Sequence, residues 1–137
     1  MVRAILAATS AWALCSADVL ALTLTPDEAA AREVALQWLQ LADSGKYQQA
    51  AVEIAEQVRD SQRWLSYFAA HRAPVGRVNK RQIVEIKHAS TIPGAPDVRN
   101  YDVIRFKTSF ERKPVAMEEV VLAKMGCCWE VSGYKID

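Results

Sequence analysis

The sequence lacks most of the short patterns that identify enzymes and cofactor-binding proteins. Its 137 residues include only two histidines, three cysteines and five glycines. Neither His-Glu-x-x-His nor Cys-x-x-Cys occurs, which excludes these zinc-binding motifs. The glycines are scattered and form no phosphate-binding loop, and no Gly-x-Ser-x-Gly turn is present. We therefore expect neither a metal nor a cofactor.

An excess of charge of one sign is also missing. The chain has 17 basic and 16 acidic side chains and a formal net charge of +1. Removal of residues 1–17 would remove one of these charges, Arg3, and leave 16 of each sign. No general attraction to nucleic acid or to an anionic membrane follows. Five basic residues of the strand region could bind an anionic partner or surface, but a solvated face is the favoured interpretation: Arg77, Lys80, Arg81, Arg105 and Lys107.

No hydrophobic run reaches the roughly 20 residues that a membrane span requires. The apolar run from Ala4 to Ala17 is shorter, follows a single basic residue and leads into small residues that a signal peptidase accepts. The pattern predicts a signal peptide, residues 1–21, cleaved near Ala17 or Ala21, and an exported protein, periplasmic or secreted. Leu14 precedes Cys15 where lipidation requires a small residue, so lipidation is the less favoured alternative.

The last third of the chain has the alternation of apolar and polar residues that is typical of β-strands. In Tyr101–Phe110 the apolar residues recur at even spacing, and Val115–Met125 forms a second run. In the last strand, strict alternation places Trp129 and Val131 on one face and Tyr134 and Ile136 on the other. A bulge at Gly133 would turn all four to one side.

Helices are predicted before these strands. Thr25-Pro26-Asp27-Glu28 has the pattern of a capping box, and apolar residues at helical spacing extend this helix to Ser44, before Gly45. A shorter helix is expected from Lys46 to about Val58. A third begins near Asp60 or Ser61 and ends before Pro74 and Gly76. Residues 77–89 then form the first strand.

Helices followed by strands predict an α+β fold, in which N-terminal helices pack on one face of a curved antiparallel sheet of about four strands. Residues 22–137 are expected to form one domain. Its core should bury four aromatic rings together: Trp38, Trp64, Phe106 and Trp129.

Several ordered segments of the chain carry a family resemblance. They are Trp38-Leu39, Asp43-Ser44-Gly45-Lys46-Tyr47, Gln62-Arg63-Trp64, Arg72-Ala73-Pro74-Val75-Gly76, Pro93-Gly94-Ala95-Pro96-Asp97 and Trp129-Glu130-Val131-Ser132-Gly133-Tyr134. Together they resemble the bacterial domain-of-unknown-function family 4019 over nearly all of the mature chain. The resemblance implies a cystatin-like or nuclear-transport-factor-like outline and no established activity. Two features depart from the family pattern: Ala51 in place of a common aromatic, and the Cys127-Cys128 pair.

Three carboxylates are candidates for acid or base chemistry: Asp102, Glu118 and Glu119. A buried carboxylate on the concave side of a curved sheet would have a raised pKa and would suit a general base. Strand alternation places Glu118 and Glu119 on opposite faces, so only one of them can serve. A solvated strand position is the favoured interpretation of each. His71 and His88 stand apart, and we expect surface or packing roles for both.

Cys127 and Cys128 form the sharpest local feature. Adjacent Cα atoms lie about 3.8 Å apart, below the usual disulfide range, so a bond between these neighbours would be strained and reducible. Alternation directs Cys127 inward with Trp129 and Cys128 outward. An outward thiol at Cys128 on an exported protein predicts an intermolecular disulfide and a homodimer. The favoured alternative is that both thiols are reduced and have no function.

Two hypotheses for function remain. The first is an exported, non-enzymatic module that binds a protein or a small apolar ligand between helices and sheet. The second is a small-molecule enzyme with a carboxylate acid or base in the same crevice. Full solvation of Asp102, Glu118 and Glu119 would remove the second hypothesis.

Overall fold

The computed structural model describes residues 23–95 and 98–137 of the chain. The predicted signal peptide and Cys15 lie outside the described residues. The first described helix, α1, covers Pro26–Asp43. The predicted capping box is confirmed, because Thr25 Oγ1 accepts a hydrogen bond from the Glu28 N–H at 3.2 Å and Glu28 Oε2 accepts one from the Thr25 N–H at 2.8 Å. Gly45, with a φ of +72°, follows the end of the helix.

The helical region continues in short segments. These are α2 (Tyr47–Val52), the 3₁₀ turn η1 (Glu56–Val58), α3 (Ser61–Tyr67), the π-helical turn η2 (Phe68–Arg72) and the 3₁₀ turn η3 (Ala73–Val75). The second helix ends six residues before the predicted limit at Val58. The backbone leaves the helix there because Ala55 N–H donates to Val131 O at 2.8 Å, which attaches this segment to the last strand. Asp60 caps α3 as predicted.

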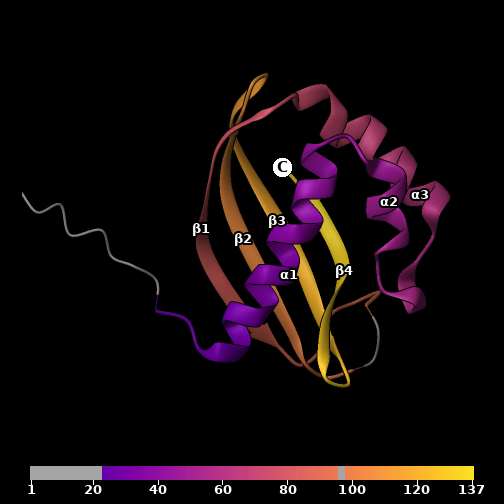
Figure 1. Cartoon of the computed structure of the whole chain (residues 1–137), viewed down its shortest axis with the longest axis vertical. Helices are drawn as coiled ribbons and strands as arrows, with labels where there is room; N and C mark the ends of the chain where they lie inside the picture. The colour runs from indigo at the N-terminus through magenta and orange to yellow at the C-terminus, as the bar shows by residue number, and fades with distance from the viewer. Residues whose placement is uncertain (1–22, 96–97) are drawn as a thin grey trace, which may run out of the picture.

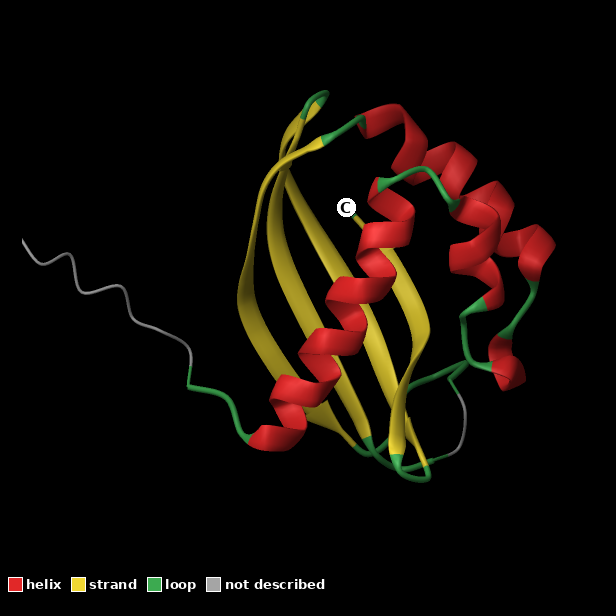
Figure 2. Ribbon diagram, in the orientation of Figure 1, coloured by secondary structure: helices red, strands yellow, loops and turns green. Residues whose placement is uncertain are grey.

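Four strands form one antiparallel sheet in the order β1-β2-β3-β4. Their bounds are β1 (Val78–Ala89), β2 (Tyr101–Phe110), β3 (Lys113–Met125) and β4 (Cys128–Ile136). The curved sheet lies on one side of α1, and α2 and α3 lie beside β4 (Figure 1; Figure 2). The predicted α+β fold is therefore confirmed. Among the described helices, none is both long enough and apolar enough to cross a membrane.

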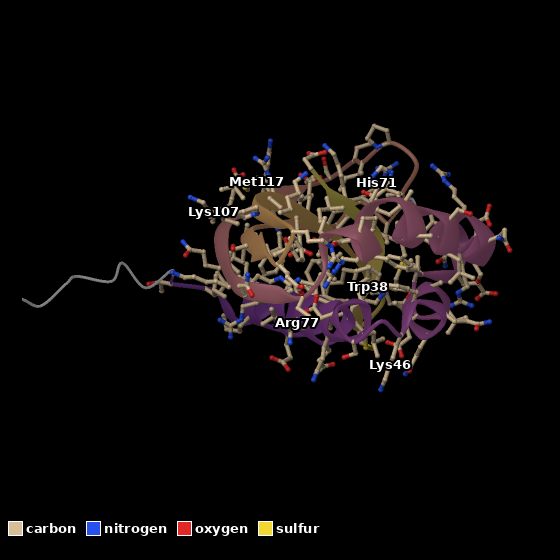
Figure 3. The ribbon with its side chains drawn as sticks, turned by 90° about the horizontal axis from the view of Figure 1, so that it is seen from above. Trp38, Lys46, His71, Arg77, Lys107 and Met117 are labelled. Carbon is tan, nitrogen blue, oxygen red and sulfur yellow. A yellow bond between two sulfur atoms is a disulfide. The ribbon has the colours of Figure 1, made fainter. Side chains whose placement is uncertain are left out.

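The core lies between α1 and the sheet. Trp38 is 2% exposed and lies between the two layers, whereas Lys107 and Met117 lie on the opposite side of the sheet (Figure 3). Phe106 and Trp129 belong to the same buried cluster. Trp64 packs against this cluster but remains partly exposed, so three of the four predicted rings are fully part of the core.

The predicted bulge in β4 is present. Val131 pairs with Leu122 and Gly133 pairs with Val121, which leaves Ser132 as an extra residue in β4. The extra residue reverses the alternation, so the side chains on both sides of it face the helices: Trp129, Val131, Tyr134 and Ile136 are all buried. A Cβ at position 133 would lie 3.3 Å from the side chain of Val121, which favours glycine there.

Replacing Trp38 with alanine should destabilise the fold. Its ring lies 5.2 Å from Tyr134, and its indole N–H donates to Ala50 O at 2.9 Å. We expect the free energy of unfolding to fall by about 3 to 5 kcal/mol in urea titrations followed by circular dichroism. The control is Leu36→Ala, at a helix position that is 39% exposed, which should cost less than about 1 kcal/mol. Equal losses in the two variants would contradict this core.

Candidate functional site

Glu118 lies at the centre of a buried polar cluster between the sheet and the end of α1. Its side chain is fully buried, and its two oxygens accept four hydrogen bonds. Arg81 binds both oxygens, at 2.8 and 3.1 Å. The hydroxyls of Thr108 and Tyr134 each donate at 2.6 Å. A buried carboxylate that accepts this many hydrogen bonds ties separate elements of the fold together.

Arg81 connects Glu118 to the last residue of α1. Its guanidinium also donates to both oxygens of Asp43, at 2.7 and 3.0 Å. Asp43 in turn accepts a hydrogen bond of 3.1 Å from Arg72, whose guanidinium carbon lies 4.7 Å from the centre of the Phe110 ring. We call these residues the buried ion network: Asp43, Arg72, Arg81, Thr108, Glu118 and Tyr134.

The expectation that Arg81 is solvated is wrong. Its side chain is only 12% exposed, because Arg81 pairs with Thr108 in the β1–β2 register and shares the inner face of the sheet. Burial opposes its charge, but the hydrogen bonds to Asp43 and Glu118 outweigh burial and raise the pKa of Arg81. Burial, followed by the charge of Glu118, likewise raises the pKa of Tyr134.

Glu119 lies on the outer face of the sheet. Its carboxylate is 3.6 Å from Arg105 Nε, and both side chains are more than one third exposed. Glu118 and Glu119 therefore occupy opposite faces, in the alternation expected of a strand. An exposed ion pair of this kind contributes little to stability.

Asp102 forms a separate pair with His88. The two residues are partners in the β1–β2 register, and Asp102 Oδ1 is hydrogen-bonded to His88 Nδ1. Asp102 is fully buried, whereas the His88 side chain is 62% exposed. Asp102 Oδ2 has no hydrogen-bond partner among the described residues. Burial raises the pKa of Asp102, and the opposing influence of His88 is smaller.

The structure does not bring Asp102 and Glu118 together. Asp102 pairs with Leu122 on β3, four residues along the strand from Glu118, and four residues of strand span about 13 Å. Neither residue is solvated, so the condition that would have removed the enzyme hypothesis is not met. Within residues 23–95 and 98–137, no group of three or more histidine, cysteine or acidic side chains is placed to hold a metal ion.

A groove of about 540 Å³ lies between the α3–η2 segment and β4, and the β1–β2 connection closes one side of it. We call it the α3–β4 groove. Its described lining is Val58, Arg63, Trp64, Ser66, Tyr67, Ala70, His71, Pro93, Gly94, Ser132 and Tyr134. Figure 3 shows His71 on the helical segment beside the sheet. No carboxylate is present among these described lining residues, which leaves two basic side chains, Arg63 and His71, without an acidic neighbour in the wall.

Aromatic rings form one wall of the groove. The Trp64 and Tyr67 rings meet edge to face with centres 6.0 Å apart, and the Tyr67 and His71 rings lie 4.5 Å apart. The sequence predicted Trp64 as a core ring. The structure leaves it partly exposed at the groove, because spacing along one helix does not reveal what lies opposite.

The edge of β4 supplies backbone groups to the same groove. Met117 and Asp137 exchange two backbone hydrogen bonds, of 3.2 and 3.0 Å. In an antiparallel pair, hydrogen-bonded and non-hydrogen-bonded positions alternate, so Lys135 and Gly133 also bond to β3 through their main chain. Tyr134 lies between them, and its N–H and C=O therefore point away from β3, to the free edge of the sheet. A groove ligand can therefore meet a donor and an acceptor of the main chain as well as side chains.

Cys127 and Cys128 are bonded to each other in the structure. Cys127 does not point inward as alternation predicted, because β4 begins at Cys128 and Cys127 belongs to the preceding turn. Both residues are exposed. The favoured interpretation of two reduced thiols is therefore corrected, and the intermolecular disulfide through Cys128 stays a prediction.

Glu118→Gln should destabilise the protein far more than Glu119→Gln. The first change leaves a buried guanidinium and two buried hydroxyls without an anionic acceptor, and we expect a loss of about 3 kcal/mol. The second change removes one exposed ion pair and should cost less than about 1 kcal/mol. Urea titrations of both variants measure the difference. A loss at position 119 equal to that at position 118 would show that Glu118 is not buried as described.

Asp102→Asn should change how stability depends on pH. Because its pKa is raised in the folded state, Asp102 favours folding below its unfolded pKa of about 3.9, and this contribution is lost as pH rises through the folded value. The asparagine variant should therefore gain in free energy of unfolding, relative to its parent, between pH 4 and pH 8. Both proteins should carry His88→Gln, so that the histidine does not titrate. A difference that is constant with pH would contradict a buried Asp102.

Comparison with known proteins adds one finding. A family model described as "Protein of unknown function (DUF4019)" matches residues 34–134, from the middle of α1 to Tyr134 in β4. No curated protein matches the chain. The matched range includes the buried ion network, the His88–Asp102 pair, the α3–β4 groove and the Cys127–Cys128 hairpin. The chain belongs to the DUF4019 family of proteins of unknown function.

Proposed function

We propose that this chain is an exported, non-enzymatic module that binds a small ligand in the α3–β4 groove. The observation that carries the proposal is the make-up of the groove: aromatic rings and two basic side chains around about 540 Å³, with no described carboxylate. Sites for small molecules commonly have volumes of about 300 to 1,000 Å³ and combine apolar walls with a few polar groups.

The groove favours a ligand with a flat apolar body and an anionic group. Trp64 and Tyr67 offer ring surfaces for stacking. Arg63 and His71 supply donors for a carboxylate, and the free N–H of Tyr134 adds another. A cationic ligand would face these donors and would find no carboxylate in the described lining to bind it.

Export is supported by two features. Residues 1–21 have a basic start, an apolar run and small residues near the cleavage positions. The bond between Cys127 and Cys128 suits an oxidising compartment. We propose a periplasmic or secreted location on these grounds.

A second candidate function rests on the His88–Asp102 pair. A buried carboxylate that orients an exposed imidazole is an arrangement that suits general base catalysis. Neither residue belongs to the described lining of the α3–β4 groove, so a reaction at His88 would take place elsewhere on the molecule. The groove is therefore the stronger basis for a function.

Binding can be measured by ¹H–¹⁵N NMR with indole-3-acetate and 2-naphthoate as probes. We expect the indole N–H signal of Trp64 to shift with probe concentration. The Trp38 signal should stay in place, because that indole is buried and donates to Ala50 O. Arg63→Gln should weaken binding about tenfold, which corresponds to about 1.4 kcal/mol. Arg77→Gln is the matched control, since Arg77 is 89% exposed, lies outside the groove and should leave binding unchanged.

Two results would contradict the proposal. The first is the absence of any shift of the Trp64 signal with either probe at millimolar concentration. The second is a shift that Arg63→Gln and Arg77→Gln reduce equally, which would indicate nonspecific attraction of anions. Loss of binding in His88→Gln, with Arg63→Gln unaffected, would instead favour the second candidate function.

A further inference from the structure

We propose that the bonded pair Cys127–Cys128 is a thiol-exchange site, at which a thiol-bearing partner becomes linked to Cys128. The pair lies at the tip of the β3–β4 hairpin, and both residues are exposed. Access by a thiol from solvent is one of the two requirements for exchange, and a disulfide that opens readily is the other.

The hairpin holds the pair in a fixed position. Met125 and Cys128 are partners at the end of the ladder, and Gly126 and Cys127 form the two-residue turn between them. Gly126 has a φ of +66°, as the first central position of a type II′ turn requires, and Cys127 has no positive φ. Because β4 starts at Cys128, this residue lies on the strand side of the turn and alternates with the inward-facing Trp129. The Cys128 side chain therefore belongs to the outer face of the sheet.

Adjacency makes this disulfide easier to open than an ordinary one. The two Cα atoms are 3.8 Å apart, which is the spacing that a trans peptide bond imposes on any neighbours. Most disulfides join Cα atoms about 4.4 to 6.8 Å apart, and bonds outside that range are more reducible. No rearrangement of the hairpin can lengthen this spacing, so the strain belongs to the sequence itself.

The exchange replaces one disulfide by another without net oxidation. A thiolate attacks Sγ of Cys128, the bond between the two cysteine sulfurs breaks, and its electron pair leaves on Sγ of Cys127. A new sulfur–sulfur bond then joins the partner to Cys128, and the Cys127 thiolate takes a proton from water. A second thiol of the partner can attack that bond, which releases the partner as a disulfide and leaves both cysteines reduced.

The linked state should persist. Return to the starting state requires Cys127 to attack the mixed disulfide at its neighbour, and this attack rebuilds the strained bond. A cysteine pair separated by two residues meets no such obstacle and releases its partner readily. The Cys127–Cys128 pair therefore suits attachment of a thiol. The same step, with the thiol of a second copy as the partner, gives the homodimer predicted from the sequence.

The test uses the full chain with Cys15→Ser, so that Cys127 and Cys128 are the only cysteines left in the protein. The protein is incubated with graded glutathione, the reaction is stopped by alkylation, and the products are measured by intact and tandem mass spectrometry. The matched control adds Met125→Cys and Cys127→Ser, which places a cysteine opposite Cys128 at a spacing of about 5.5 Å, inside the usual range. Dithiothreitol replaces glutathione in a parallel series.

We expect half of the native pair to open at a glutathione concentration at least about tenfold below that required by the control. A glutathione adduct should be found on Cys128, and dithiothreitol should yield both free thiols without an adduct. Three results would overturn the proposal: the same midpoint for the native pair and the control, an adduct confined to Cys127, or two free thiols before any thiol is added under air.

Discussion

The fold depends on one buried contact, the ion pair between Arg81 and Glu118. It joins β1 to β3 across β2, and through Asp43 it reaches the end of α1. Burial of two charges is costly unless each is paired and hydrogen-bonded. Here both oxygens of Glu118 accept hydrogen bonds, so its charge is compensated. The same network holds the end of α1 at a defined distance from the sheet.

Tyr134 connects this network to the α3–β4 groove. Its hydroxyl donates to Glu118, and the same residue lines the groove. The floor of the groove at Tyr134 is therefore held by the buried ion network, whereas its aromatic wall is partly exposed. A rigid floor lowers the conformational cost of binding a small ligand. Neither His88 nor Asp102 belongs to the described lining of this groove, and the His88 imidazole is exposed to solvent.

Local chemistry made much of the fold predictable. The capping box at Thr25 and the bulge beside Gly133 each depend on a few neighbouring residues, and both are present. The buried position of Arg81 was not predictable in the same way, because it depends on carboxylates 38 residues before it and 37 after it in the chain. A crevice between helices and sheet was expected, but the residues that line the groove were not predictable, since its walls come from separate segments. The bond between Cys127 and Cys128 differs from the favoured expectation of two reduced thiols, since adjacency alone indicated only that such a bond would be strained.

The most direct test of this account is the rate at which the Arg81 Nε–H exchanges with water, measured by ¹H–¹⁵N NMR and assigned with Arg81→Lys. Because this group donates to the fully buried Glu118, we expect exchange far slower than that of Arg77 Nε–H, whose side chain is 89% exposed. Exchange of Arg81 Nε–H at the rate of Arg77 Nε–H would show that the buried ion network does not hold the helices to the sheet.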